Sequence, residues 1–200
     1  MPADSASLAP EAARAVPARR QVILTTVFFL AASLVFLGRP PLFDPDEGYY
    51  PAAAVEMAGR GNWFDPVFNA QPRWGKPFAF YLADCFTFRL SGQSEFAARL
   101  PSAAAGLGLA LATLAIATLL FGVRAGSLAG IFAATAIQPV VYSRAAVPYM
   151  FLAFFVAMSL YCFMRAWAAA ERSGSGQSGW LLCGYATAGL AFLSKGPLGV

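Results

Sequence analysis

The sequence predicts an all-α polytopic membrane protein with about five transmembrane helices. Of its 200 residues, 58% are apolar and 12% are charged, and the mean hydropathy is +0.59. Soluble domains average about 45–50% apolar and about 25% charged residues. An apolar helix of about 18–21 residues is roughly 27–32 Å long, which matches the hydrocarbon core of a bilayer. Five segments have this length: Gln21–Gly38, Pro101–Phe121, Ala125–Tyr142, Val147–Met164 and Trp180–Val200.

The first apolar segment, Gln21–Gly38, has the features of a retained signal anchor. Its apolar run is longer than the core of a cleaved signal peptide, and no small-residue cleavage site follows it. The basic residues Arg14, Arg19 and Arg20 precede it and predict a cytoplasmic N-terminus. Residues 1–20 are rich in Ala and Pro, and we expect them to form a disordered cytoplasmic tail.

Residues 39–98 follow the first apolar segment, and the predicted orientation places them outside the cell as the first external loop. This loop contains a polar insert from Asp44 to Phe78. Pro51 suits the first turn of a short helix that Gly59 and Gly61 would end. The stretch Pro77–Leu90 is apolar but too short to cross a bilayer comfortably. We therefore expect two interfacial helices in this loop, with many aromatic side chains at the membrane surface.

The later apolar segments carry signs of close helix packing. Ala104, Gly108 and Ala112 recur every four residues, and Gly126 and Gly130 form a GxxxG step. Small residues at this spacing let membrane helices approach each other closely. The pattern indicates a helix bundle and says nothing about chemistry.

Composition also excludes several classes of function. The net charge of +4 comes from basic residues dispersed between apolar segments, so no basic stripe indicates nucleic-acid binding. Histidine is absent, which removes catalysis by Ser-His or Cys-His pairs. Cys85, Cys162 and Cys183 are far apart in the sequence and are interpreted as small apolar core residues.

The insert brings an acidic pair close to the membrane surface. Asp46 and Glu47 follow the first apolar segment by about eight residues, and Arg73 and Lys76 come later in the same loop. Transfer of a sugar from a lipid phosphate needs a base for the acceptor and a cation for the leaving phosphate. Asp46, with Lys76 and Arg73, supplies these groups. Glu47 is the second catalytic candidate, and a capping role is its alternative.

The order of these motifs resembles that of the lipid-linked-sugar glycosyltransferases. The motifs are DPDEGYY, an EM followed by GNW, a Lys-Pro step, EFAARLPSA, Ser143-Arg144 and LSKGP, and together they extend over nearly all of residues 22–200. The family includes the aminoarabinose transferases of lipid A and the dolichyl-phosphate-mannose protein mannosyltransferases. The resemblance implies that Asp46 is the catalytic carboxylate and that Lys76 contacts the carrier phosphate. It also implies short juxtamembrane helices in the first external loop.

The resemblance implies a polyprenyl-phosphate sugar donor, a lipid or protein acceptor, and a bacterial inner membrane. Residues 21–200 would then be the N-terminal part of a glycosyltransferase membrane domain. Further donor-binding candidates are Tyr50, Arg144 and Lys195, and for both cations a snorkelling anchor is the alternative. The chain has Gly75 where the family often has an acid, and Tyr149 where it usually has Asp, so a divalent metal requirement stays open. Two other functions also stay open: a non-catalytic subunit or degenerate paralogue, and a flippase or transporter of a lipid-linked sugar.

Overall fold

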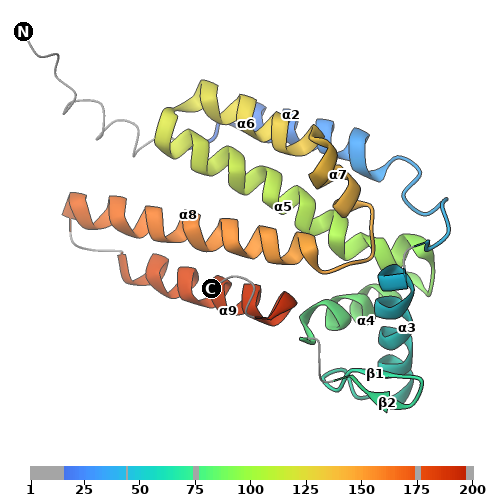
Figure 1. Cartoon of the computed structure of the whole chain (residues 1–200). Coiled ribbons are helices and arrows are strands. Elements are labelled where there is room, and N and C mark those ends of the chain that lie inside the picture. The colour runs from blue at the N-terminus through green and yellow to red at the C-terminus, as the bar shows by residue number, and fades with distance from the viewer. Residues whose placement is uncertain (1–15, 44, 74–76, 174–176, 197–200) are drawn as a thin grey trace, which may run out of the picture.

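A computed structural model describes residues 16–43, 45–73, 77–173 and 177–196. Within these ranges the protein is helical apart from one two-stranded hairpin, as Figure 1 shows. The elements in chain order are α2 (Arg19–Phe29), the π-helix η1 (Leu30–Leu34), α3 (Pro45–Arg60), β1 (Val67–Phe68), β2 (Gln71–Pro72), α4 (Ala79–Ser91), α5 (Glu95–Phe121), α6 (Val123–Thr135), α7 (Ile137–Ser143), α8 (Tyr149–Ser173) and α9 (Gln177–Lys195).

The helices form two groups. The helices α2, α5, α6, α8 and α9 run side by side, whereas α3, α4 and the hairpin gather at one end of this bundle (Figure 1). The strands of the hairpin are antiparallel, with Val67 opposite Pro72. The prediction of an all-α fold is therefore confirmed, and two helices, α3 and α4, lie between η1 and α5; their interfacial position and the external side of the loop stay predictions.

The predicted number of five spans is met only in part. Among the described residues, α5 and α8 are long and apolar enough to cross a membrane. The helices α6 and α7 qualify together as one span that is bent by 54°. The predicted first span is divided into α2 and η1, and neither this segment nor α9 passes the same criterion. Length and composition thus support two spans, or three if the bent pair counts as one.

The bend between α6 and α7 has a local cause. Ala136 takes an extended conformation with ψ 143° and separates the two helices. Three residues later, Pro139 lacks the N–H that would bond to the carbonyl of Thr135 in a continuous helix, and its ring would collide with that carbonyl. The predicted segment Ala125–Tyr142 is therefore broken near its middle.

Helix α5 begins six residues before the predicted start at Pro101. The side chain of Ser94 caps the helix by accepting a hydrogen bond of 3.2 Å from the N–H of Ala97. Pro101 lies inside the helix and cannot donate to the carbonyl of Ala97. The hydroxyl of Thr87 donates to that carbonyl at 2.9 Å instead, so α4 compensates for the proline in α5.

Helix α3 also begins earlier than predicted. Its first residue is Pro45, and Pro51, which was expected in the first turn, lies inside the helix. The acidic pair Asp46 and Glu47 therefore belongs to the first helical turn rather than to a preceding loop. This placement fixes the direction of both carboxylates relative to the bundle.

The predicted glycine faces do permit close helix packing. A Cβ atom on Gly130 would lie 2.8 Å from the side chains of both Leu114 and Thr25. A Cβ atom on Gly108 would lie 2.6 Å from the ring of Phe154. The helices α2, α5, α6 and α8 thus pack against glycines that no larger residue could replace without movement.

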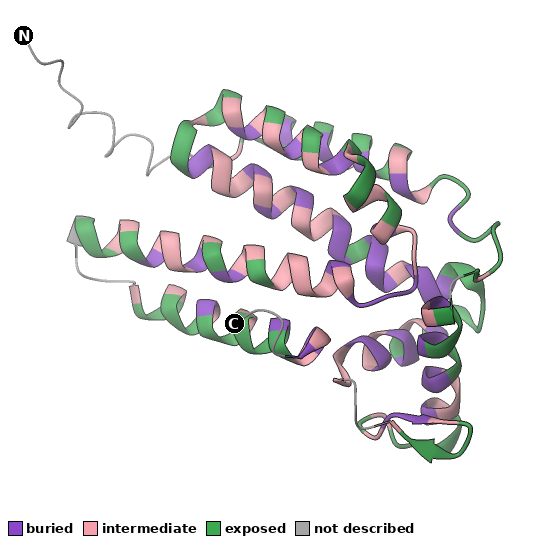
Figure 2. Ribbon diagram, in the orientation of Figure 1, coloured by how far each residue is buried: buried purple, intermediate pink, exposed green. Residues whose placement is uncertain are grey.

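The buried core lies where the two groups of helices meet. Figure 2 shows buried residues concentrated in α3, α4 and the first turns of α5, whereas the outer faces of the bundle are exposed. The exposed faces of the long helices carry apolar side chains, as expected for surfaces in contact with lipid. The largest core cluster contains Tyr50, Ala53, Ala54, Met57, Phe80, Tyr81, Cys85, Phe88, Ala97, Ala98, Ala146 and Val147.

Candidate active site at the junction of the loop and the bundle

Asp46 lies in the first turn of α3, where the segment between η1 and α5 meets the helix bundle. Its side chain is half-buried. Asp46 is also close enough to two phenols to act on them electrostatically, because its charge contributes to the raised pKa values of Tyr50 and Tyr81.

Tyr50 and Tyr81 form the inner wall of the candidate site. Their ring centroids are 5.1 Å apart, and both residues are buried. Burial is the main reason that the pKa of each phenol is raised, and the nearby charge of Asp46 adds to it. Both phenols therefore keep their protons at neutral pH, so each hydroxyl can donate a hydrogen bond to an anionic group.

Two of the predicted cations lie over tyrosine rings of this region. Arg73 follows β2, and its guanidinium carbon lies 5.1 Å from the ring centroid of Tyr49 and 5.8 Å from that of Tyr50. Its charge lowers the pKa of both Tyr50 and Tyr81, which opposes the effect of burial. At the end of α9, the Nζ atom of Lys195 lies 3.4 Å above the ring of Tyr149.

Tyr149 connects this lysine to the rest of the site. It stands at the start of α8, and its electrostatic interaction with Tyr50 raises the pKa of that phenol further. Its ring also packs against that of Tyr142, with centroids 5.0 Å apart and the two planes tilted by 39°. The structure therefore brings Asp46, Tyr50, Arg73 and Lys195 to one region. These predicted residues come from α3, the end of the hairpin and α9.

Glu47, the second catalytic candidate, is engaged in a buried ion pair. Its carboxylate accepts hydrogen bonds from Arg99 Nε at 3.1 Å, and from the backbone N–H groups of Ala146 at 2.9 Å and Phe43 at 3.2 Å. Burial alone would raise its pKa, but these bonds outweigh burial and lower the pKa below its ordinary value. The geometry thus gives Glu47 a structural task.

Arg99 was not among the predicted site residues, although it lies within the quoted EFAARLPSA motif. Besides Glu47, it donates to three carbonyl oxygens of the segment before α3, which belong to Leu37 at 3.0 Å, Pro40 at 2.7 Å and Pro41 at 2.9 Å. Only 3% of Arg99 is exposed. Together with Glu47 it joins four segments around the base of α3: the chain before α3, α3 itself, α5 and the turn before α8. An arginine inside an otherwise apolar helix was the sequence signal for this role.

Arg144 has a comparable structural task. Its Nη1 atom donates to the carbonyl oxygens of Ser33 at 2.9 Å and Val35 at 2.8 Å, where η1 ends. These bonds satisfy carbonyls that have no partner within the helix. No contact of Arg144 with the phenols of the site is recorded among the described residues. Lys76, the predicted phosphate ligand, lies outside the described residues.

Asp84 is a buried acid that the sequence did not single out. It lies on α4, one turn after Tyr81, and is fully buried. Neither of its carboxylate oxygens has a hydrogen-bond partner in the described part of the chain. Burial raises the pKa of this carboxyl well above its ordinary value. Burial thus favours the protonated form of the Asp84 carboxyl. Among the described residues, no group of three or more acidic, His or Cys side chains is placed to hold a metal ion.

Comparison with known proteins identifies related sequences. Residues 71–200 match the family described as dolichyl-phosphate-mannose-protein mannosyltransferase. The undecaprenyl phosphate-alpha-4-amino-4-deoxy-L-arabinose arabinosyl transferase of Aeromonas salmonicida is 38% identical over 79 residues, which cover 40% of this chain and 14% of that protein. An uncharacterized protein of Aquifex aeolicus is 29% identical over 178 residues, covering 89% of this chain and 39% of its own length.

The same fold is present in a solved structure. ArnT from Cupriavidus metallidurans, crystallised with undecaprenyl phosphate, superposes with a TM-score of 0.79 at 27% sequence identity. The match covers 90% of this chain and 32% of ArnT. The apo form of the same protein gives a TM-score of 0.78. The chain therefore spans about a third of the length of this structural relative.

Proposed function

Because the chain belongs to the dolichyl-phosphate-mannose-protein mannosyltransferase family, we propose that it transfers a sugar from a polyprenyl-phosphate donor to an external acceptor. The observation that carries this proposal is the grouping of Asp46 with two protonated phenols and the cations Arg73 and Lys195. A carboxylate base beside donors for a phosphate is the set of groups that this reaction needs.

In the proposed reaction, Asp46 removes the proton of the acceptor hydroxyl or amine. The acceptor atom attacks the anomeric carbon, and the bond from that carbon to the phosphate oxygen breaks with its electron pair. A single displacement of this kind inverts the anomeric configuration. The departing polyprenyl phosphate gains negative charge. We expect the cations Arg73, Lys76 and Lys195 to neutralise this charge.

The donor class is inferred from relatives. The solved relative binds undecaprenyl phosphate, and this supports a carrier of the same kind here. The exposed apolar faces of the bundle would keep the carrier's tail in lipid while its phosphate reaches the end of the bundle where α3 begins. We infer that this end faces the outside of a bacterial inner membrane and that the N-terminus is cytoplasmic.

The decisive experiment is a transfer assay on membranes that contain the protein, with radiolabelled polyprenyl-phosphate sugars. We expect Asp46→Asn to reduce transfer by about 10²–10⁴-fold, because the variant keeps the size of the side chain and loses the base. Asp65→Asn, in the same external loop, is the matched control and should retain activity. Transfer by Asp46→Asn at the wild-type rate would refute the assignment. No transfer by the wild-type protein from any donor would favour a non-catalytic subunit.

The assay also tests the phosphate ligand. Lys76→Ala should raise the KM for the donor more than the KM for the acceptor, because only the donor carries the phosphate. An equal rise in both constants would contradict a phosphate contact.

A further inference from the structure

The end of the bundle opposite the candidate active site carries an arginine inside an apolar helix. Arg165 lies on α8, eight residues before Ser173, the last residue of that helix. This distance corresponds to about 12 Å along the helix axis. Arg165 therefore belongs to the segment that qualifies as a membrane span. An ionised side chain at such a depth is costly unless a partner of opposite charge is present.

No acidic side chain of the described residues provides that partner. The ion pairs within the described part of the chain are Arg60 with Glu56 and Arg99 with Glu47, and neither involves Arg165. The acid nearest in sequence on α8 is Glu171, and its carboxylate accepts a hydrogen bond of 2.6 Å from Trp167. The guanidinium thus needs an anion that this part of the protein does not supply.

Aromatic rings hold the guanidinium between α8 and α9. Its carbon lies 5.0 Å from the ring centroid of Trp180 on α9 and 5.9 Å from that of Tyr161 on α8. Its Nη1 atom reaches the hydroxyl of Tyr161 at 3.5 Å. Stacking uses the face of a guanidinium and leaves the N–H groups at its edge available to a phosphate. Tryptophan and tyrosine also favour the depth of lipid headgroups.

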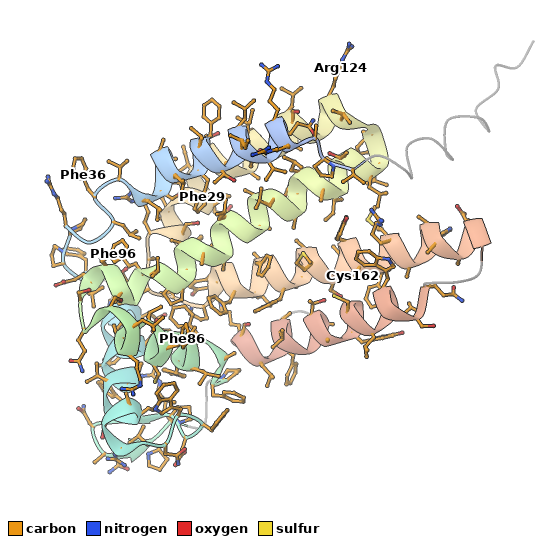
Figure 3. All side chains as sticks on the ribbon, turned by 180° about the vertical axis from the view of Figure 1, so that it is seen from behind. Phe29, Phe36, Phe86, Phe96, Arg124 and Cys162 are labelled. Carbon is orange, nitrogen blue, oxygen red and sulfur yellow. The ribbon has the colours of Figure 1, made fainter. Side chains whose placement is uncertain are left out.

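Further basic residues lie at the same end of the bundle. Arg19 and Arg20 begin α2, and Arg124 begins α6. Figure 3 shows Arg124 at the end of the bundle away from Phe36, Phe86 and Phe96, with Cys162, one turn before Arg165, closer to that same end. The start of α9 and the end of α8 lie there as well (Figure 1). This concentration of positive charge attracts anionic lipid.

We propose that Arg165 and Trp180 form a binding site for the phosphodiester of an anionic phospholipid, in the leaflet where α8 ends and α9 begins. The guanidinium contacts the phosphate oxygens, and Trp180 stacks on the guanidinium and holds it in place. The site lies at the end of the bundle opposite Asp46, and it does not depend on the proposed sugar transfer.

The test measures lipid binding to the purified full chain by native mass spectrometry, with phosphatidylglycerol and phosphatidylcholine of identical acyl chains. The wild-type protein should bind phosphatidylglycerol more tightly. Arg165→Gln should weaken that binding about fivefold, the effect of one basic residue near the membrane, and leave phosphatidylcholine binding unchanged. The affinity of Arg165→Lys for phosphatidylglycerol should lie between those of the wild type and Arg165→Gln, because lysine keeps the charge but loses the planar guanidinium.

The matched control is Arg124→Gln, which removes the same charge from an exposed position at the same end. We expect it to change phosphatidylglycerol binding less than twofold. A loss as large as that of Arg165→Gln would show general surface attraction and overturn the proposal. Equal binding of the two lipids by the wild-type protein would overturn it too. If Arg165→Gln does not fold, Trp180→Leu replaces it, and wild-type affinity in that variant contradicts the site.

Discussion

Arg99→Met should severely destabilise the protein, because it leaves Glu47 buried without its counter-charge. Removing one partner of a buried ion pair costs about 3–5 kcal/mol. Three carbonyl oxygens, of Leu37, Pro40 and Pro41, lose their donor at the same time. Glu47 keeps two backbone hydrogen bonds, which prevents a larger loss. For a protein of this size, the change corresponds to a decrease of roughly 6–20 °C in Tm.

The measurement is thermal unfolding of the purified protein in detergent at neutral pH. Arg60→Met is the matched control, because Arg60 forms an exposed ion pair with Glu56 at 2.7 Å. Exposed pairs contribute only about 0–1 kcal/mol, so this variant should unfold close to wild type. The double variant with Glu47→Gln should recover part of the stability, because no unpaired charge is then buried.

Lowering the pH should reduce the difference in stability between Arg99→Met and the wild type. The folded pKa of Glu47 is lowered from 4.5, so the stability from its ionised form is present above pH 4.5 and is lost as the pH falls through the folded pKa. If Arg99→Met is no less stable than Arg60→Met at neutral pH, the ion pair does not hold the base of α3 and the reasoning fails.

Two further predictions concern buried positions. Asp84→Leu should stabilise the protein by about 1–3 kcal/mol at neutral pH, because a buried carboxyl without a partner is replaced by an apolar side chain. This gain in stability should become smaller as the pH is lowered towards 3.8. Because the pKa of Asp84 is raised in the folded protein, the wild type loses stability as the pH rises from 3.8 through the folded pKa. Chemical unfolding at several pH values measures both effects, and a destabilised variant would show that Asp84 has a partner. Gly130→Ala should destabilise the protein by about 1–3 kcal/mol through overpacking, whereas Gly189→Ala, with open space around it, should not. Equal Tm values for the two alanine variants would contradict close packing at Gly130.

The features of the fold that the sequence predicted depend on residues close together in the chain. Apolar segments of membrane length predicted the bundle, and small residues spaced every four positions predicted the close approach of α5 and α6. Pro51, Gly59 and Gly61 predicted the helix that became α3, although its start at Pro45 was missed. These features depend on neighbours within a few residues, so the order of residues determines them. Helix starts were less accurate, because the cap at Ser94 and the contact of Thr87 with Ala97 allow α5 to begin before Pro101.

Only the tertiary structure distinguished the two adjacent acids. Asp46 and Glu47 have the same charge and stand one residue apart, which is about 100° around a helix. That rotation turns Glu47 towards Arg99, 52 residues away in the sequence, and leaves Asp46 near the phenols of α3 and α4. The sequence by itself predicted that carboxylates, cations and tyrosines gather in one loop at a membrane surface. Which of them share a site and which support the fold depends on contacts between distant segments, because burial and pairing set the charge state of each group.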